Sequence, residues 1–426
     1  MGIIAISFIL MLGFLLLKLP VFLALLVGPL VYFIFFADVP SVMIAQRVLS
    51  GVESTPLLAI PFFVCAGILM NHSGVAHKLL HLCSLLMRRV PGGLAQASIL
   101  LSVVMGGLSG SNLADAAMQS EMVVPEMEKQ GFSKPFSTVL TAFSSLITPL
   151  IPPGIAIIIF GAVANVSIGR LLIAGLGIAI LLTIVLVILV IIIAKRRNYE
   201  SIAPQVEKGD LLRAFKHAIL PLCLPVLIIG GIRFGVITPT EAGAIAVMYV
   251  LMLGLLYREL KWRHILKALK GTVMTTSSIM LIIGAASTYS WVLTRERVPQ
   301  AASEWMLATI QSPWMFLLVI NIFLLVLGMF IEGNAATIVL VPILLPIARA
   351  YGIDDIHFAM IFTFNKAISA ITPPMGTLMF ITCGITGCKI KDFLREAIPW
   401  YLTGLIVLAI ITIFPIISLG LVNLTF

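Results

Sequence analysis

Charged residues are scarce in this chain. Asp, Glu, Lys and Arg make up 11% of its 426 residues, whereas hydrophobic residues make up 60%. Soluble domains carry about 25% charged residues, so this shortage excludes an ordinary soluble protein and predicts an integral membrane protein. The period-2 alternation of a transmembrane barrel is also absent from the sequence. The spans are therefore expected to be helices.

Motifs that would indicate other chemistry are missing or incomplete. The five cysteines form no Cys-x-x-Cys pair, and we interpret them as small packing residues. No GxxxxGK(S/T) loop is present, so ATP is not expected to be the direct energy source. The sequence GLSG at 107–110 fits the nucleophile motif of serine intramembrane proteases, which also need a histidine in another span. The later histidines lie beside polar loops, so an intramembrane hydrolase is the disfavoured alternative.

Apolar runs recur along the whole chain. A helix needs about 20 residues to cross ~30 Å of hydrocarbon. The net charge of +9 is carried by short loops between the runs, which is typical of cytoplasmic loops and does not argue for nucleic-acid binding. Residues 257–270 are basic and amphipathic, and they predict a helix along the membrane surface. The apolar runs cover 2–37, 94–110, 137–164, 171–194, 219–232, 242–256, 273–293, 313–331 and 399–425.

A pair of prolines occurs twice at a fixed spacing. The pair at 152–153 recurs at 373–374, an offset of 221 residues (373 − 152), and the same offset relates Pro125 to Pro346. The most polar internal stretch divides the chain nearly in half. We therefore predict an internal duplication. Its parts are a first repeat over 1–194 with scaffold helices, a hairpin and a broken helix, a polar linker over 195–218, and a second, inverted repeat over 219–426 that contains the surface helix, a hairpin and a broken helix.

Each predicted repeat combines a polar point with a proline break. GGLSGSNLAD (106–115) precedes ITPLIPPG (147–154), and GMFIEGNAAT (328–337) precedes ISAITPPMGTLMF (368–380). Apolar arms of about 12 residues are too short to cross the bilayer, so each polar point is expected to be the tip of a re-entrant hairpin. Proline removes a helical hydrogen bond and kinks or breaks the helix. Each proline pair therefore predicts a broken helix.

Neutral oxygen donors gather near both breaks. An unsatisfied backbone group costs several kcal/mol in hydrocarbon, and a bound cation is one partner that satisfies it. Neutral oxygens suit a monovalent ion that must be released again, whereas Ca²⁺ sites gather carboxylates. The alternative is that proline and small residues only kink and pack the helices. The donors are Ser109, Ser111, Asn112 and Thr148 in the first half and Asn334, Thr337, Thr372 and Thr377 in the second.

A few charged residues fall within apolar sequence. Each costs about 2.5 to 3.5 kcal/mol at a helix centre on insertion scales. We expect Asp115 either to orient the first tip or to act only as an internal hydrogen-bond acceptor. Glu332 is expected to serve similarly at the second tip, and Lys366 to pair with it or to meet an anionic substrate; the alternative places both near an interface. The charged residues are Asp115, Glu121, Glu332 and Lys366.

Glu241 has a structural explanation. It stands three residues after Thr238 in the sequence TPTE, with Pro239 between them. Threonine followed three residues later by glutamate is the capping box of a helix start, and proline is favoured at the first helical position. We favour a structural role for Glu241, as a helix cap, over a role as a ligand.

The sequence resembles the large membrane subunit of tripartite ATP-independent periplasmic (TRAP) transporters, the DctM-like family. The resemblance spans essentially the whole chain, and its most specific elements are TPTEAGA and GxSGSxxAD. The second tip departs from the family pattern, with Glu332 and Gly333 in place of an Asp-Pro-like pair. The matching segments are TPLLAIPFFVCAGILM (55–70), PGGLAQASILLSVVMGGLSGSNLAD (91–115), ITPLIPPG (147–154), GVITPTEAGAIAVMY (235–249) and VPILLPIA (341–348).

This resemblance implies an all-α polytopic protein of the bacterial inner membrane, with an elevator-type fold of the ion-transporter superfamily. It implies three partners besides membrane lipid: a small four-helix membrane subunit, a periplasmic substrate-binding protein and an organic acid anion. Sodium would drive import of the anion, such as a C4-dicarboxylate, sialic acid or a sugar acid. A stand-alone sodium/organic-anion symporter without a binding protein is the alternative.

The resemblance also implies two Na⁺ sites with substrate between the two tips. The first site would comprise the first tip and the break at 148–154, with Ser109, Gly110, Ser111, Asn112, Thr148 and Pro149. The second would comprise the second tip and the break at 372–376, with Gly333, Asn334, Thr372, Met375, Gly376 and Thr377. Substrate would contact Ser111, Asn112, Pro153, Gly154, Asn334, Lys366 and Pro374.

Overall fold

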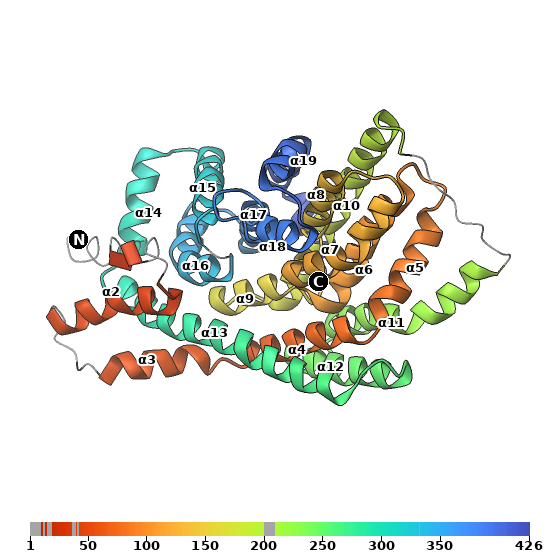
Figure 1. The fold of residues 1–426 in the computed structure, drawn as a ribbon. Helices are drawn as coiled ribbons and strands as arrows, with labels where there is room; N and C mark the ends of the chain where they lie inside the picture. The colour runs from red at the N-terminus through yellow and green to blue at the C-terminus, as the bar shows by residue number, and fades with distance from the viewer. Residues whose placement is uncertain are drawn as a thin grey trace.

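Figure 1 shows a computed structural model of the chain, which is helical throughout its described elements. The structure describes residues 10–11, 13–14, 19–35, 40, 42–199, 209–331 and 333–426. The helices of the first half are α2 (Val21–Phe35), α3 (Val42–Val52), η1 (Thr55–Leu58), α4 (Ala59–His72), α5 (Val75–Met87), α6 (Gly93–Ser109), α7 (Asn112–Lys129), α8 (Lys134–Ser144), η2 (Thr148–Leu150), α9 (Ile155–Ala164) and α10 (Ile168–Arg196). Those of the second half are α11 (Asp210–Arg233), α12 (Pro239–Leu256), α13 (Trp262–Arg295), α14 (Val298–Thr309), α15 (Pro313–Gly328), α16 (Gly333–Ala350), α17 (Asp355–Ser369), α18 (Thr377–Thr386), α19 (Ile390–Ile413) and α20 (Ile416–Thr425).

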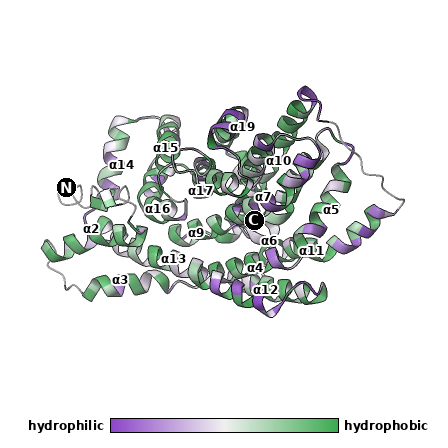
Figure 2. Ribbon diagram, in the orientation of Figure 1, coloured by the Kyte–Doolittle hydropathy of each residue, from purple (hydrophilic) through white to green (hydrophobic). Residues whose placement is uncertain are grey.

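The helices are long and apolar enough for a polytopic membrane protein, as predicted. Within the described residues, seven helices could cross a membrane, or up to nine if two bent pairs each form one span. One bent pair is the first broken helix, in which Lys134–Leu150 and Ile155–Ala164 meet at 43°. Figure 2 shows hydrophobic residues along most of each helix, with hydrophilic residues concentrated at places such as the start of α11.

Two predicted elements have different lengths in the structure. The basic stretch 257–270 is not a separate surface helix, because Trp262 begins α13, a continuous helix of 34 residues. The hairpin arms are also longer than predicted: α6 has 17 residues and α7 has 18. Helix α7 continues beyond its apolar part and includes Glu126, Glu128 and Lys129. Hydropathy alone would place the end of this helix before these charged residues.

One layer of helices lies along the lower side of the view in Figure 1, and the hairpins and broken helices lie above it. We call α2, α3, α4, α11, α12 and α13 the base layer. Within it α13 packs against α2, α3 and α4, and α12 packs against α4 and α11. The predicted capping box at the start of α12 is confirmed: the Glu241 carboxylate accepts from the Thr238 backbone N–H at 2.7 Å, and the Glu241 N–H donates to the Thr238 hydroxyl at 3.3 Å.

Above the base layer, the two halves contain the same order of elements. The first hairpin consists of α6 and α7, and the second of α15 and α16. The second helix of each hairpin starts at Asn112 in the first half and at Gly333 in the second half. The helix that follows it starts at Lys134 in the first half and at Asp355 in the second half. Both pairs differ by the sequence offset of 221 residues (333 − 112 and 355 − 134).

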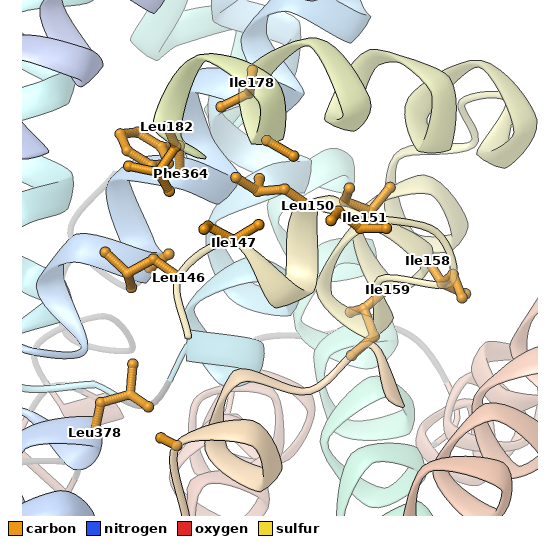
Figure 3. Packing of buried hydrophobic residues seen from close by; sticks show 14 of the residues in the cluster. Leu146, Ile147, Leu150, Ile151, Ile158, Ile159, Ile178, Leu182, Phe364 and Leu378 are labelled. Atoms are coloured by element: carbon orange, nitrogen blue, oxygen red, sulfur yellow. The ribbon is translucent and has the colours of Figure 1, made fainter. Parts of the chain in front are cut away.

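A proline break follows each hairpin. The first break is residues 145–154, between α8 and α9, and the second is residues 370–376, between α17 and α18. Pro152-Pro153 and Pro373-Pro374 are both joined by cis peptide bonds. Buried side chains surround the first break in Figure 3, where Leu146, Ile147, Leu150 and Ile151 lie among residues from α9, α10, α17 and α18. This packing holds the irregular backbone within protein, as its polar groups require.

Candidate functional site

The tip of the first hairpin is a sharp turn between two helices. Helix α6 ends at Ser109, and Gly110 follows with a φ of 60°, in the left-handed region. Ser111 then caps α7, because its hydroxyl accepts a hydrogen bond from the Ala114 N–H at 3.4 Å. The side-chain oxygen of Asn112 accepts from the Leu113 N–H at 3.0 Å. Local hydrogen bonds therefore hold the polar side chains of this tip.

The first tip packs directly on the first break. The Ile155 N–H, at the start of α9, donates to the Gly110 carbonyl at 3.2 Å. A Cβ atom at Gly110 would overlap the Pro153 carbonyl, and one at Gly154 would overlap the Pro149 carbonyl. Only glycine allows both the backbone turn and this close approach.

Asp115 forms a second connection between the first hairpin and the break. Its side chain is 1% exposed and accepts hydrogen bonds from three residues. The Ser102 hydroxyl donates to it at 2.7 Å, the Gln119 amide at 3.0 Å and the Thr148 hydroxyl at 2.9 Å. Asp115 is thus an internal hydrogen-bond acceptor, which is one interpretation from the sequence. The same hydrogen bonds join α6 and α7 to the break, so they also suit the other interpretation, in which Asp115 orients the first tip.

The second tip packs on the second break in a similar manner. The Met375 N–H donates to the Met329 carbonyl at 3.2 Å. The Lys366 ammonium donates to the Thr337 hydroxyl of α16 and lies 5.5 Å from the centre of the Phe362 ring. Glu332, the predicted partner of Lys366, lies outside the described residues.

Both tips meet at one cavity of about 150 Å³. Its lining includes the first residues of four helices: Asn112 of α7, Ile155 of α9, Gly333 of α16 and Thr377 of α18. A helix N-terminus carries a partial charge of about +0.5, together with backbone N–H groups that have no partner within the helix. Lys366 also lines the cavity. The helix N-termini and the Lys366 ammonium are groups of the kind that stabilise a bound anion.

The predicted site residues divide into two groups. Those that line the cavity are Gly110, Ser111, Asn112, Pro149, Gly333, Asn334, Lys366 and Thr377. The others lie behind the lining, or away from it, in the tips and breaks; they are Ser109, Thr148, Pro153, Gly154, Thr372, Pro374, Met375 and Gly376. The hydroxyl of Thr372, for example, donates to the Ile368 carbonyl of its own helix at 3.0 Å.

Two polar residues of the lining were not predicted. Thr363 lies three residues before Lys366 on α17, and Thr275 comes from α13 in the base layer. The spacing of Thr363 from Lys366 is the signal that could have identified it, because residues three apart lie on the same face of a helix. Thr275 offered no comparable signal, since nothing in the sequence places α13 beside the tips.

The serine of the GLSG motif is not arranged as a nucleophile. The Ser109 hydroxyl is buried and donates to the Met105 carbonyl of its own helix at 3.2 Å. Among the described residues, no histidine lines the cavity. Nucleophilic catalysis by serine requires a base within hydrogen-bonding reach. This geometry gives no support to an intramembrane hydrolase.

The cavity and tips supply neutral oxygen donors. In the described parts of the chain, no group of three or more His, Cys, Asp or Glu residues is placed to hold a metal ion. The polar lining consists of serine, threonine and asparagine side chains and the backbone of both tips, together with Lys366. Among the described residues, the oxygen atoms of this lining are all neutral, and they lack the carboxylates that Ca²⁺ sites gather.

Comparison with known proteins identifies relatives of the chain. The sequence profile of the family described as "Tripartite ATP-independent periplasmic transporter, DctM component" matches residues 8–417. The sialic acid TRAP transporter large permease protein SiaM of Vibrio cholerae is 36% identical over 381 residues, which cover 89% of each chain. The 2,3-diketo-L-gulonate TRAP transporter large permease protein YiaN of Escherichia coli is 33% identical, over 89% of this chain and 90% of its own.

One further relative and one solved structure extend the comparison. The C4-dicarboxylate TRAP transporter large permease protein DctM of Pseudomonas aeruginosa is 36% identical over 89% of each chain. The crystal structure of the YdaH transporter of Alcanivorax borkumensis has a similar fold, with a TM-score of 0.60, 14% sequence identity and coverage of 97% of this chain and 98% of that one. The match of the family profile over nearly the whole chain decides the assignment. The chain belongs to the DctM family of tripartite ATP-independent periplasmic transporters.

Proposed function

We propose that the chain is the large membrane subunit of a sodium-coupled importer of an organic acid anion. Its partners would be a small four-helix membrane subunit and a periplasmic binding protein that delivers the anion. The named substrates of three relatives support this class, because sialic acid, C4-dicarboxylates and 2,3-diketo-L-gulonate are all organic acids.

The convergence of four helix N-termini and Lys366 on one cavity carries the proposal. Electrostatic interactions are stronger in the low dielectric of the membrane interior than in water. The positive groups of this cavity attract an anion and oppose its release into water. Release therefore requires a change in another interaction that affects how strongly the anion is held. Binding and release of a cation nearby provide such a change.

Sodium is the proposed cation because the tips and breaks offer neutral oxygen donors beside the anion cavity. The proposed sites are those named from the sequence, with Asn112 at the first tip and Asn334 at the second. Each Na⁺ that enters down a potential of about 100 mV supplies ~2.3 kcal/mol. Two ions supply about 4.6 kcal/mol, which supports a roughly thousandfold concentration ratio of the anion.

We further propose that the two halves are inverted repeats and that transport uses an elevator movement. The offset of 221 residues between their helix starts supports the duplication (333 − 112). The cavity lies at the boundary between the hairpins and the base layer, because Val64 of α4 and Thr275 of α13 also line it. A movement of the hairpins and broken helices along the base layer would carry the anion and leave these two residues behind.

Asn112→Ala tests the proposed site. The substitution removes the side-chain oxygen and amide that line the cavity, and it leaves the backbone of the tip in place. We expect uptake into proteoliposomes, with both partner proteins supplied, to fall about tenfold, and the sodium concentration for half-maximal uptake to rise. Asn423→Ala on α20, at an exposed position, is the control and should leave both unchanged. Unaltered uptake and sodium dependence in Asn112→Ala would discard the site.

A further inference from the structure

We infer that the first turns of α13 bind the anionic headgroups of membrane phospholipids. This surface belongs to the base layer and is separate from the polar residues of both tips. The inference depends neither on the substrate nor on the coupling ion proposed above. It follows from the charge of residues 257–270 and from the faces that the start of α13 presents.

Positive charge is concentrated where α12 ends and α13 begins. Residues 257–270 contain five Lys and Arg residues and a single acidic residue, Glu259, which interacts electrostatically with Lys78 of α5. All five basic residues are exposed. None of them forms a salt bridge within the part of the chain that the structure describes. The five basic residues are Arg258, Lys261, Arg263, Lys267 and Lys270.

The first turns of α13 have three distinct faces, because residues three, four and seven apart lie on the same side of a helix. Ala268 and Thr272 lie on a buried face. A second face is apolar, and its residues are between 49% and 71% exposed. We call it the apolar stripe, and it consists of Trp262, Leu266, Leu269 and Val273. The third face, which we call the basic stripe, consists of Arg263, Lys267 and Lys270.

The two exposed stripes lie side by side, since each residue of the basic stripe directly follows one of the apolar stripe in the sequence. Water alone would solvate the basic stripe but not the apolar one, and hydrocarbon alone would do the reverse. A helix at the membrane interface meets both needs, because its apolar face contacts acyl chains while its basic face contacts headgroups. Tryptophan is also enriched at this level of the membrane. The start of α13 therefore fits the surface of a lipid bilayer.

The charge of the basic stripe selects the kind of lipid. Loops rich in Lys and Arg are typical of the cytoplasmic side, and anionic lipids make the surface of that leaflet negative. Each basic residue near such a surface strengthens binding about fivefold. Helix α13 continues from Lys270 to Thr275, which lines the cavity five residues further on (275 − 270). Bound lipid would thus anchor the wall that the base layer contributes to the cavity.

Quenching of Trp262 fluorescence by brominated lipids tests the inference. The chain and its small-subunit partner are reconstituted in an equimolar mixture of anionic phosphatidylglycerol and zwitterionic phosphatidylcholine. In each sample one of the two lipids is brominated near the headgroup end of its acyl chains. The difference between the wild type and Trp262→Phe gives the signal of Trp262. We expect a preference for phosphatidylglycerol of at least about fivefold at low salt, which falls at high salt because the charges are screened.

Two triple variants provide the second arm. Replacing the whole basic stripe with glutamine should make quenching by the two lipids equal, because the charge that attracts the headgroups is lost. The control removes the same number of positive charges from exposed positions at the start of α19 and should keep the preference. The stripe variant is Arg263→Gln, Lys267→Gln and Lys270→Gln, and the control variant is Lys389→Gln, Lys391→Gln and Arg395→Gln.

Three results would overturn the inference. They are equal quenching by both lipids in the wild type, a preference that the stripe variant retains, and an absence of Trp262 quenching by either lipid. The last result would show that protein covers the apolar stripe. Unfolding temperatures equal to that of the wild type would show that both variants are folded. If the stripe variant does not fold, the wild type decides, because a preference that is unchanged at high salt would contradict an electrostatic origin.

Discussion

At the scale of the residue, Asp115 joins segments that are distant in the sequence. Its donors come from α6, from α7 and from the first break. The Gln119 amide that donates to Asp115 also donates to the Ser102 hydroxyl at 2.6 Å, and its oxygen accepts from Ser98. The directions of these hydrogen bonds suit a carboxylate, which only accepts. The network therefore fixes the position of the tip relative to the break.

Asp115→Asn should destabilise this part of the protein. The asparagine amide would present two N–H donors to groups that already donate, and a buried polar group without a partner costs about 1 to 3 kcal/mol. We expect a lower unfolding temperature of the purified protein and slower uptake. Glu121→Gln makes the same chemical change at an exposed position of the same helix and should have little effect. Equal unfolding temperatures for the two variants would contradict the role of the network.

Several of these residue contacts could be predicted from the sequence. The capping box of Glu241 follows from local spacing and is confirmed. The polar residues of both tips were predicted because each tip is polar within apolar sequence, and half of the predicted site residues line one cavity. Thr275 was missed because its contribution depends on how α13 packs against the hairpins, which local sequence does not specify.

At the scale of the element, the first hairpin and the first break form one unit. The Gly110 carbonyl accepts a hydrogen bond from the start of α9, and the absence of a side chain at Gly110 lets the Pro153 carbonyl approach. The proline pairs predicted both breaks because proline interrupts helical hydrogen bonds. The length of α13 was not predicted, because its first turns are polar and the rest of the helix is apolar. The structure joins both parts in one continuous helix.

Gly110→Ala tests this contact between tip and break. Its Cβ atom would overlap the Pro153 carbonyl, in addition to the cost of placing alanine at a φ of 60°. Gly131→Ala is a matched control, since Gly131 has a φ of 88° but a Cβ atom there would meet nothing within 4 Å. We expect Gly131→Ala to cost about 1 kcal/mol and to retain uptake, whereas Gly110→Ala should abolish most uptake. Similar uptake by both variants would show that the close approach is unimportant.

At the scale of the whole molecule, the chain is a multi-pass protein of the bacterial inner membrane. The sequence predicted the pairing of a hairpin with the break of its own half. The structure adds contacts between the halves, because α7 packs against α18 and α16 packs against α9. These contacts bring both tips to one cavity. They depend on packing between distant helices, so hydropathy and proline spacing in each half could not predict them.

The most direct test of the account is the uptake of the organic acid held by the binding protein. The large and small subunits are reconstituted into proteoliposomes, and the loaded binding protein is added outside. An inward sodium gradient should drive accumulation of the acid, whereas an equal potassium gradient, or omission of the binding protein, should give none. Sodium-driven accumulation without the binding protein would contradict the tripartite mechanism and favour a stand-alone symporter. Equal accumulation without sodium would contradict the central claim of sodium-coupled transport.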